Sequence, residues 1–205
     1  MTDLPLAPPA VPLPTGFKGT RNYLQSADLW NACVEALFGD ADKADWSMRM
    51  NFRALTDQAP LLVPLDEARD RPGRFAEVIA SRDDRRLSYV LVESGQPAVG
   101  RYEDKESSLN SAVQIDGDVA RFDGPLAATP IELIVAMTKK LHLTSVDKDV
   151  RWLATRLALP AAIGDVGKAT YEVQLGPLVG KRASRSTVAV DGQVVGEIAF
   201  NAIEA

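Results

Sequence analysis

Two acidic side chains stand at the start of segments that have the pattern of a helix. Asp28 follows Ser26 in the first of these segments, and Glu132 follows Thr129 in the second. A positioned carboxylate can act as a general base. The same carboxylates can equally serve the positive end of the helix dipole, and both interpretations stay open. Together with Asn31, which lies close behind Asp28, they are the candidate catalytic residues.

Basic and amide side chains form a second group of candidates, which could hold a substrate that carries phosphates. Two arginines and an asparagine alternate with apolar residues near position 50, and two basic residues follow a glycine-rich stretch near position 180. Such cations bind phosphate through charge-assisted hydrogen bonds. The alternatives are a solvated strand face and an ordinary loop, since the stretch lacks P-loop spacing. With the first helical serine, the candidate substrate-binding residues are Ser26, Arg49, Asn51, Arg53, Lys181 and Arg182.

The composition argues against several kinds of chemistry. The single histidine, His142, and the single cysteine, Cys33, rule out the usual zinc sites and an intrachain disulfide. No loop has the spacing of a carboxylate metal site, so we expect no metal and no cofactor. The sequence has no Gly-x-Ser-x-Gly motif, so hydrolysis by a nucleophilic serine has no support from it. The lone cysteine fits a reducing compartment, and we expect a cytoplasmic location.

Bulk properties are those of a globular chain of 205 residues, 46% hydrophobic and 25% charged. A net charge of −5 argues against a nucleic-acid partner. No apolar run approaches the roughly 20 residues that span a bilayer. Residues 1–16 hold five prolines and predict an extended arm, neither a helix nor a signal peptide.

The first half predicts a helix over residues 26–38, capped by Ser26 and ended by Gly39. Residues 46–54 alternate strictly and predict a half-buried strand, with Met48, Met50 and Phe52 inside and Arg49 and Arg53 accessible. A loop is expected over 60–74, strands over 75–81 and 87–93, and a tight hairpin at 94–95. Residues 104–108 are the candidate linker.

The second half begins with a hairpin at residues 116–117 and continues with a helix from Thr129, whose capping box includes Glu132. The histidine ends this helix, where the dipole favours it. Residues 149–159 are ambiguous, with a slight preference for helix at their start. Strands are expected over 169–175, 184–190 and 194–201, with a turn at 191–192.

The two halves match each other: Ala32 to Leu55 lies over Ala136 to Leu159, an offset of 104 residues. A repeat of this length is a whole folding unit. Each half places a helix directly before a long patterned segment and then several strands. We interpret the chain as an internal duplication.

This element order resembles the hotdog superfamily over about residues 17–203. The resemblance implies an α+β fold with two hotdog-like units, each a long helix wrapped by a curved antiparallel sheet. We expect these units at residues 17–105 and 109–205, after the arm at 1–16, with their sheets joined into one.

Hotdog proteins mostly act on acyl thioesters of coenzyme A or acyl carrier protein, so the resemblance implies thioesterase- or dehydratase-like chemistry. In the superfamily a helix N-terminus polarises the thioester carbonyl. The dehydratases pair a histidine before the helix with an acid on it, and this chain has no histidine there. A non-catalytic protein that binds an acyl chain or other apolar molecule, and a structural or assembly protein, stay open, as does a homo-oligomer. We expect the site at the first helix, because the capping box of the second occupies donors that a carbonyl would need.

Overall fold

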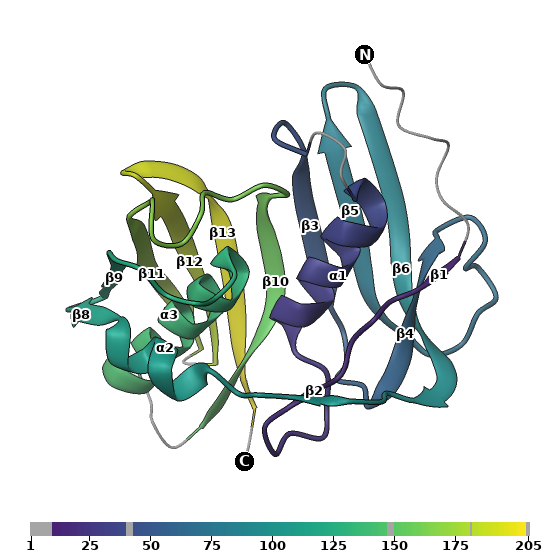
Figure 1. Cartoon of the computed structure of the whole chain (residues 1–205), viewed down its shortest axis with the longest axis horizontal. Coiled ribbons are helices and arrows are strands. Elements are labelled where there is room, and N and C mark those ends of the chain that lie inside the picture. Colours follow the sequence, from purple (N-terminus) through teal and green to yellow (C-terminus); the bar gives the residue numbers. More distant parts are fainter. Residues whose placement is uncertain (1–9, 40–42, 147–149, 181, 204–205) are drawn as a thin grey trace. The chain divides into compact units, whose positions relative to one another are not determined.

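The computed structural model describes residues 10–39, 43–146, 150–180 and 182–203. The chain forms two compact units that divide between Asp104 and Lys105. Each unit is α+β, with helices lying on one face of an antiparallel sheet (Figure 1).

In its described residues, unit 1 contains one helix and a five-stranded sheet, with a separate parallel pair of short strands. Neighbouring strands of the sheet follow the order β1–β4–β6–β5–β3, and β2 pairs with β7. The elements are β1 (Val11–Pro12), β2 (Phe17–Lys18), α1 (Ser26–Phe38), β3 (Ser47–Phe52), β4 (Gln58–Pro64), β5 (Arg74–Arg82), β6 (Arg85–Pro97) and β7 (Arg101–Tyr102).

Helix α1 and strand β3 form as their patterns predict. Gly39 ends the helix in the left-handed region, at a φ of 49°. Trp46 packs against Phe38 of the helix, with ring centroids 5.3 Å apart. Met48 and Met50, on the same side of the strand as Trp46, are fully buried, which confirms the alternation. Phe52 is only half-buried, because the strand ends there.

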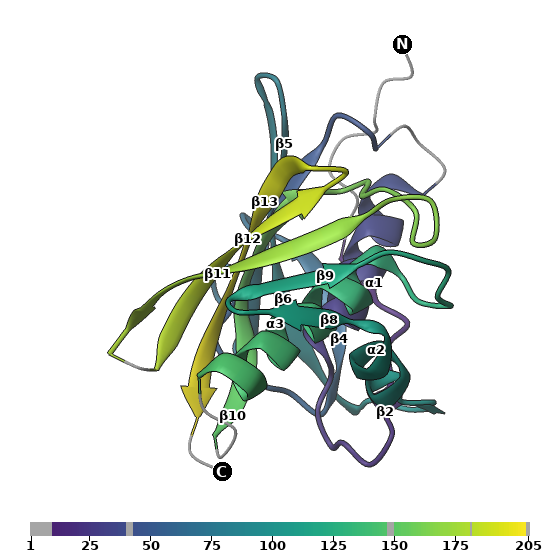
Figure 2. The same ribbon diagram turned by 90° about the vertical axis from the view of Figure 1, so that its left-hand side faces the viewer.

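The part of unit 2 that the structure describes contains two helices and a six-stranded sheet. Strand order is β10–β13–β12–β11–β9–β8, and Figure 2 shows β11, β12 and β13 side by side. The elements are α2 (Glu106–Ala112), β8 (Gln114–Asp116), β9 (Val119–Phe122), α3 (Pro130–Ser145), β10 (Arg151–Pro160), β11 (Tyr171–Val179), β12 (Ala183–Val190) and β13 (Gln193–Ile203).

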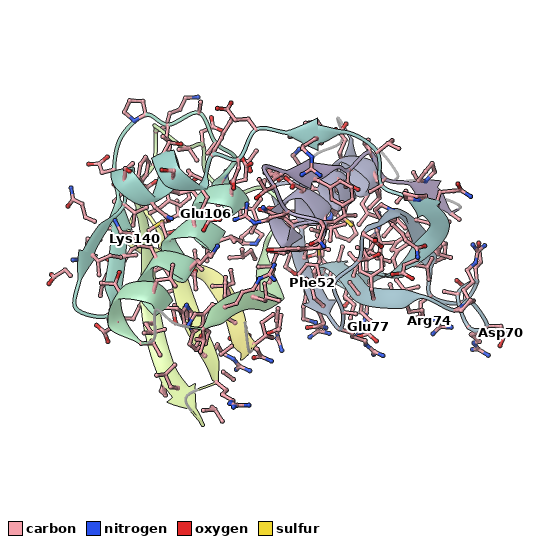
Figure 3. All side chains as sticks on the ribbon, turned by 90° about the horizontal axis from the view of Figure 1, so that it is seen from below. Phe52, Asp70, Arg74, Glu77, Glu106 and Lys140 are labelled. Atoms are coloured by element: carbon pink, nitrogen blue, oxygen red, sulfur yellow. The ribbon has the colours of Figure 1, made fainter. Side chains whose placement is uncertain are left out.

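The two units share an element order but differ in strand order. Helix α3 starts at residue 130, which is 104 after the start of α1 at residue 26, and β10 starts at 151, which is 104 after β3 at 47. In unit 2 the last strand, β13, lies beside β10, whereas in unit 1 the strand beside β3 is β5. Strands β4 and β5 flank β6, so the loop that holds Asp70 carries the chain past β6 (Figure 3).

Several local expectations were wrong. The loop expected from residue 60 begins only after Pro64, because residues 58–64 form β4. Strand β1 pairs only with Leu61 and Leu62, so Pro60 and Pro64 interrupt few bonds on that side. No hairpin forms at residues 94–95, because β6 continues to Pro97 and Gly95, at a φ of 80°, lies at an irregularity in its pairing with β4.

The ambiguous segment also needed correction. The two units divide within residues 104–108, the stretch expected to be the linker, and helix α2 begins there at Glu106. Residues 151–160 form strand β10, so the preference for helix was wrong and the match to the first half was the better guide. The glycine-rich stretch belongs to β11 as far as Val179, and the turn begins only at Gly180.

Candidate functional site

Helix α1 begins without a side-chain cap. Gln25, not Ser26, holds the N-cap position, and it makes no capping hydrogen bond. With its amide oxygen turned toward Arg21, Gln25 instead accepts a bond from that guanidinium, 3.0 Å from Nη1. Ser26 is the first helical residue and is half-buried. The expectation that Ser26 caps the helix was therefore wrong, and the side chain at the N-cap position does not engage the backbone donors of the first turn.

Asp28 lies in this first turn and forms an ion pair with Lys18 of β2. Lys18 Nζ is 2.7 Å from Asp28 Oδ1, and the two side chains are 11% and 18% exposed. Asn31 follows one turn later, so it neighbours Asp28 along the helix surface, and it is half-buried. A carboxylate and an amide beside an uncapped helix start are groups that can handle a proton and orient a water molecule. Lys18 is the residue that sequence reasoning missed, since no local pattern links position 18 to position 28.

Helix α3 begins with a complete capping box. Thr129 Oγ1 accepts a bond from the Glu132 backbone N–H at 3.4 Å, and Glu132 Oε2 accepts from the Thr129 backbone N–H at 2.8 Å. Glu132 Oε2 also accepts from the Thr129 hydroxyl at 3.0 Å. Glu132 therefore closes the capping box of its own helix, whereas Asp28, also in the first turn, pairs with Lys18 of another element.

The remaining substrate-binding candidates lie elsewhere in their units. Arg49, Asn51 and Arg53 project from the face of β3 opposite the methionines that pack under α1, so unit 1 does not gather them with Asp28. Arg53 is exposed, as expected, and forms an ion pair with Glu77 of β5. Figure 3 shows Glu77 near Phe52. Arg49 is half-buried, less accessible than expected.

The two basic candidates of the second half, Lys181 and Arg182, follow Gly180 in the sequence, where a turn of unit 2 begins. Arg182 is exposed at the turn before β12, and Lys181 lies outside the described residues. The turn is far along the chain from the helix start of its unit at Pro130. Phosphate binding by this turn stays a prediction.

The single histidine is part of the core of unit 2. His142 on α3 is fully buried, and its Nδ1 lies 2.6 Å from the Thr138 carbonyl oxygen, to which it must donate. Nε2 then accepts from the Ser184 hydroxyl of β12 at 2.5 Å. The ring is tilted against Trp152 and stacked on Phe200, with centroids 4.2 and 5.2 Å away. Burial lowers the pKa of His142, while its bond to Thr138 opposes that shift.

The described residues offer little for other chemistry. They include no cluster of three or more His, Cys, Asp or Glu side chains placed to hold a metal ion. Cys33 is fully buried, and burial raises the pKa of its thiol far above the usual range, which makes it a poor nucleophile. Over the same part of the chain, no helix is both long and apolar enough to cross a membrane.

Comparison with known proteins bears on the fold. No protein-family model and no curated protein matches the sequence. The dehydratase domain of the polyketide PpsC from Mycobacterium tuberculosis is 13% identical with a TM-score of 0.52, over 89% of this chain and 85% of that one. A TesB protein of Mycobacterium avium subspecies paratuberculosis is 13% identical with a TM-score of 0.48, over 92% and 91%. The acyl-CoA thioesterase II TesB2 from Mycobacterium marinum is 10% identical with a TM-score of 0.44, over 87% and 89%.

At such identities only the fold follows. The expected resemblance to hotdog proteins is confirmed, and the chain has an α+β fold of hotdog type.

Proposed function

We propose that this protein binds an acyl thioester at the start of α1 and hydrolyses it with Asp28 as general base. The observation that carries the proposal is the contrast between the two helix starts. Asp28 stands at a helix start without a side-chain cap, whereas the box of Thr129 and Glu132 closes the start of α3. The hotdog-type fold supports the substrate class by analogy, since the dehydratase domain that it resembles has such a fold.

The proposed hydrolysis takes place at the carbonyl carbon of the thioester: water attacks, an oxyanion forms and is stabilised, and the thiolate leaves. Asp28 takes a proton from water as the water oxygen attacks the thioester carbon, and the carbonyl electrons move to its oxygen. First-turn N–H donors of α1 stabilise that oxyanion. The carbonyl then re-forms, the carbon–sulfur bond breaks, and the departing thiolate takes the proton from Asp28. The products are a carboxylic acid and a free thiol, and Asn31 orients the water.

Hydrolysis is favoured over dehydration because of where His142 lies. A dehydratase of the hotdog type needs a histidine opposite its acid, and the only histidine of this chain is 0% exposed, with both ring nitrogens engaged in the core of unit 2. The second candidate function is non-catalytic binding of an acyl chain. The position of Arg49 and Asn51 on the face of β3 turned away from α1 favours it, since these polar side chains are not placed beside Asp28.

The proposal also covers the origin of the two units, the carrier of the acyl group and the location of the protein. Each unit is taken as one hotdog-like repeat of an internal duplication, which the shared 104-residue offset of helix and strand starts supports. Their different strand order then arose after the duplication. The acyl group would arrive on coenzyme A or on an acyl carrier protein. The lone buried cysteine agrees with a cytoplasmic location.

The test is release of free thiol from a panel of acyl-CoA substrates of increasing chain length, followed with a thiol-reactive dye. Wild-type protein should release thiol from at least one member above the uncatalysed rate. Native mass spectrometry of protein taken directly from the expression host runs in parallel. An apolar ligand found bound, with no thiol released from any substrate, would assign the protein to the binding class.

A further inference from the structure

The ion pair between Lys18 and Asp28 is unusual in its degree of burial. Their side chains are 11% and 18% exposed, against 80% and 70% for the pair of Lys168 and Asp165. Exposed pairs contribute little and adopt many geometries. A pair withdrawn from water is weakly screened, so the ammonium acts strongly on the carboxylate that it touches.

Lys18 is held in place by a connection between the two ends of unit 1. Strand β2 pairs with β7, with Phe17 opposite Arg101 and Lys18 opposite Tyr102. The Gly19 backbone N–H also donates to the Tyr102 carbonyl at 3.0 Å. We call this arrangement the β2–β7 clasp. It fixes the backbone that carries Lys18 from a strand more than 80 residues away in sequence.

Arginine side chains close the clasp further. Arg101 donates to the carbonyl oxygens of Gly19 and Arg21, the latter at 3.0 Å, and its guanidinium lies 5.3 Å from the centre of the Phe17 ring. Arg21 forms an ion pair with Asp104. Gly19 packs so closely that an added Cβ would lie 2.9 Å from the Asp104 Cβ. Backbone around Lys18 is therefore determined by several independent contacts.

The cationic side chains of the clasp make different contacts. Arg101 donates to backbone carbonyls and Arg21 pairs with Asp104, while Lys18 forms an ion pair with Asp28. On α1 itself the next acid, Glu35, is two turns on and exposed. An ammonium against a carboxylate favours the ionised form, which is the form that a general base must have.

We propose that Lys18 is the positioning residue of the site, held by the β2–β7 clasp so that Asp28 is ionised and correctly oriented at the start of α1. This inference rests on the proposed function for its kinetic consequence. It adds Lys18 and the β2–β7 clasp to the residues that take part in the proposed reaction. In this proposal Lys18 contacts Asp28 and not the substrate. Its removal should therefore change the pH at which Asp28 can act as a base, without abolishing the reaction.

The kinetic test compares Lys18→Met and Lys18→Arg over pH 3 to 9, a range that includes the usual pKa of an aspartate at about 3.9. In Lys18→Met, Asp28 should take up its proton at higher pH, so the acidic limb of the kcat/KM profile should move to higher pH. The defect should be greatest at low pH and shrink as pH rises. Lys18→Arg should restore the wild-type limb. Lys168→Met, which breaks an exposed pair of the same type, is the matched control and should leave the profile unchanged. A wild-type profile in Lys18→Met, or a loss of equal size at every pH, would overturn the proposal.

A second measurement does not depend on turnover. The carboxyl carbons of aspartate, labelled with carbon-13, are titrated by NMR, and the Asp28 signal is assigned by its absence in Asp28→Asn. In Lys18→Met this signal should titrate at higher pH than in wild type, and the other signals should not move. If wild type hydrolyses no thioester but the Asp28 signal moves as expected, the hydrolase proposal fails and the role of Lys18 stands. If that signal does not move, the role of Lys18 is refuted whether or not the protein is an enzyme.

Discussion

Asp28 and Glu132 occupy equivalent sequence positions, yet their side chains do different things. One oxygen of Glu132 accepts both the backbone N–H and the hydroxyl of Thr129, which fixes it at the helix start. Asp28 forms an ion pair with Lys18 of β2, and its helix begins without a side-chain cap. The difference comes from the residue three positions earlier, which is Thr129 in one helix and Gln25 in the other.

At Glu132 we therefore expect a loss of stability without a loss of function. Thr129→Ala should lower the free energy of unfolding of unit 2 by about 0.5–2 kcal/mol, the usual cost of removing a threonine cap. Glu132→Gln should cost less, because an amide oxygen can still accept the Thr129 backbone bond. Chemical denaturation checks both values. A Glu132→Gln variant that folds like wild type but has lost its thioesterase activity would show that the site lies at α3.

The sequence alone placed Asp28 and Glu132 at the starts of their helices, but it could not show which of the two is the better candidate for a general base. Position in the first helical turn follows from capping and periodicity, and both helices begin within a residue of the expected place. The partner of Asp28 could not be predicted, because Lys18 comes from a two-residue strand whose partner is β7. Likewise, the alternation of β3 placed Arg49 and Arg53 on one face, and only the packed structure showed that this face is turned away from α1.

Helix α3 is tied to its sheet through a histidine that must stay neutral. The ring contacts β10 through Trp152, β12 through Ser184 and β13 through Phe200. Charged residues of these strands, such as Arg185 and Glu197, lie on the opposite face, where they pair with each other. No charged side chain of the described strands is thus placed to stabilise an imidazolium at this position.

Unit 2 should consequently lose stability in mild acid. The folded pKa of His142 is lowered from its ordinary 6.5, so the unfolded chain binds a proton more readily than the folded one. Stability from this residue is complete above pH 6.5 and falls as pH drops from there to the folded pKa, by at most about 1.4 kcal/mol per pH unit.

Hydrogen exchange of peptides from α3, corrected for the intrinsic effect of pH, checks this, with α1 as the internal control. Between pH 7 and pH 5, opening of α3 should increase and that of α1 should not. His142→Gln should remove the difference. Equal pH dependence in α1 and α3 would contradict the account.

Another prediction concerns the close contact of two strands in unit 2. A Cβ added to Gly196 of β13 would collide with the Ala158 carbonyl oxygen of β10, and backbone cannot yield as a flexible side chain can. Gly196→Ala should therefore cost about 1–3 kcal/mol of stability, the range for overpacking a filled interior. Thermal unfolding measures it. A variant as stable as wild type would mean that these two strands lie further apart than this contact requires.

Over the whole molecule, the fold class and the places of helices α1 and α3 could be predicted, whereas strand β4, helix α2 and the strand pairing could not. Helix-then-strand patterns, and their 104-residue offset, come from local periodicity. Which strand lies beside which depends on contacts between distant residues. Local patterns therefore predicted a hairpin at residues 94–95. In the structure, the long β6 runs through Gly95 and pairs with β4 on one side and β5 on the other.

The most direct test of the central claim is one comparison of thioester hydrolysis among three proteins. Wild type, Asp28→Asn and Glu132→Gln are assayed at pH 7 against the acyl-CoA that wild type turns over fastest. Asp28→Asn should reduce kcat/KM by more than about tenfold, since a general base typically contributes 10²–10⁴-fold. Glu132→Gln should stay within a factor of two or so of wild type, because capping changes stability and not chemistry. Unchanged turnover in Asp28→Asn, with a sharp loss in Glu132→Gln, would contradict the account and move the site to the second helix.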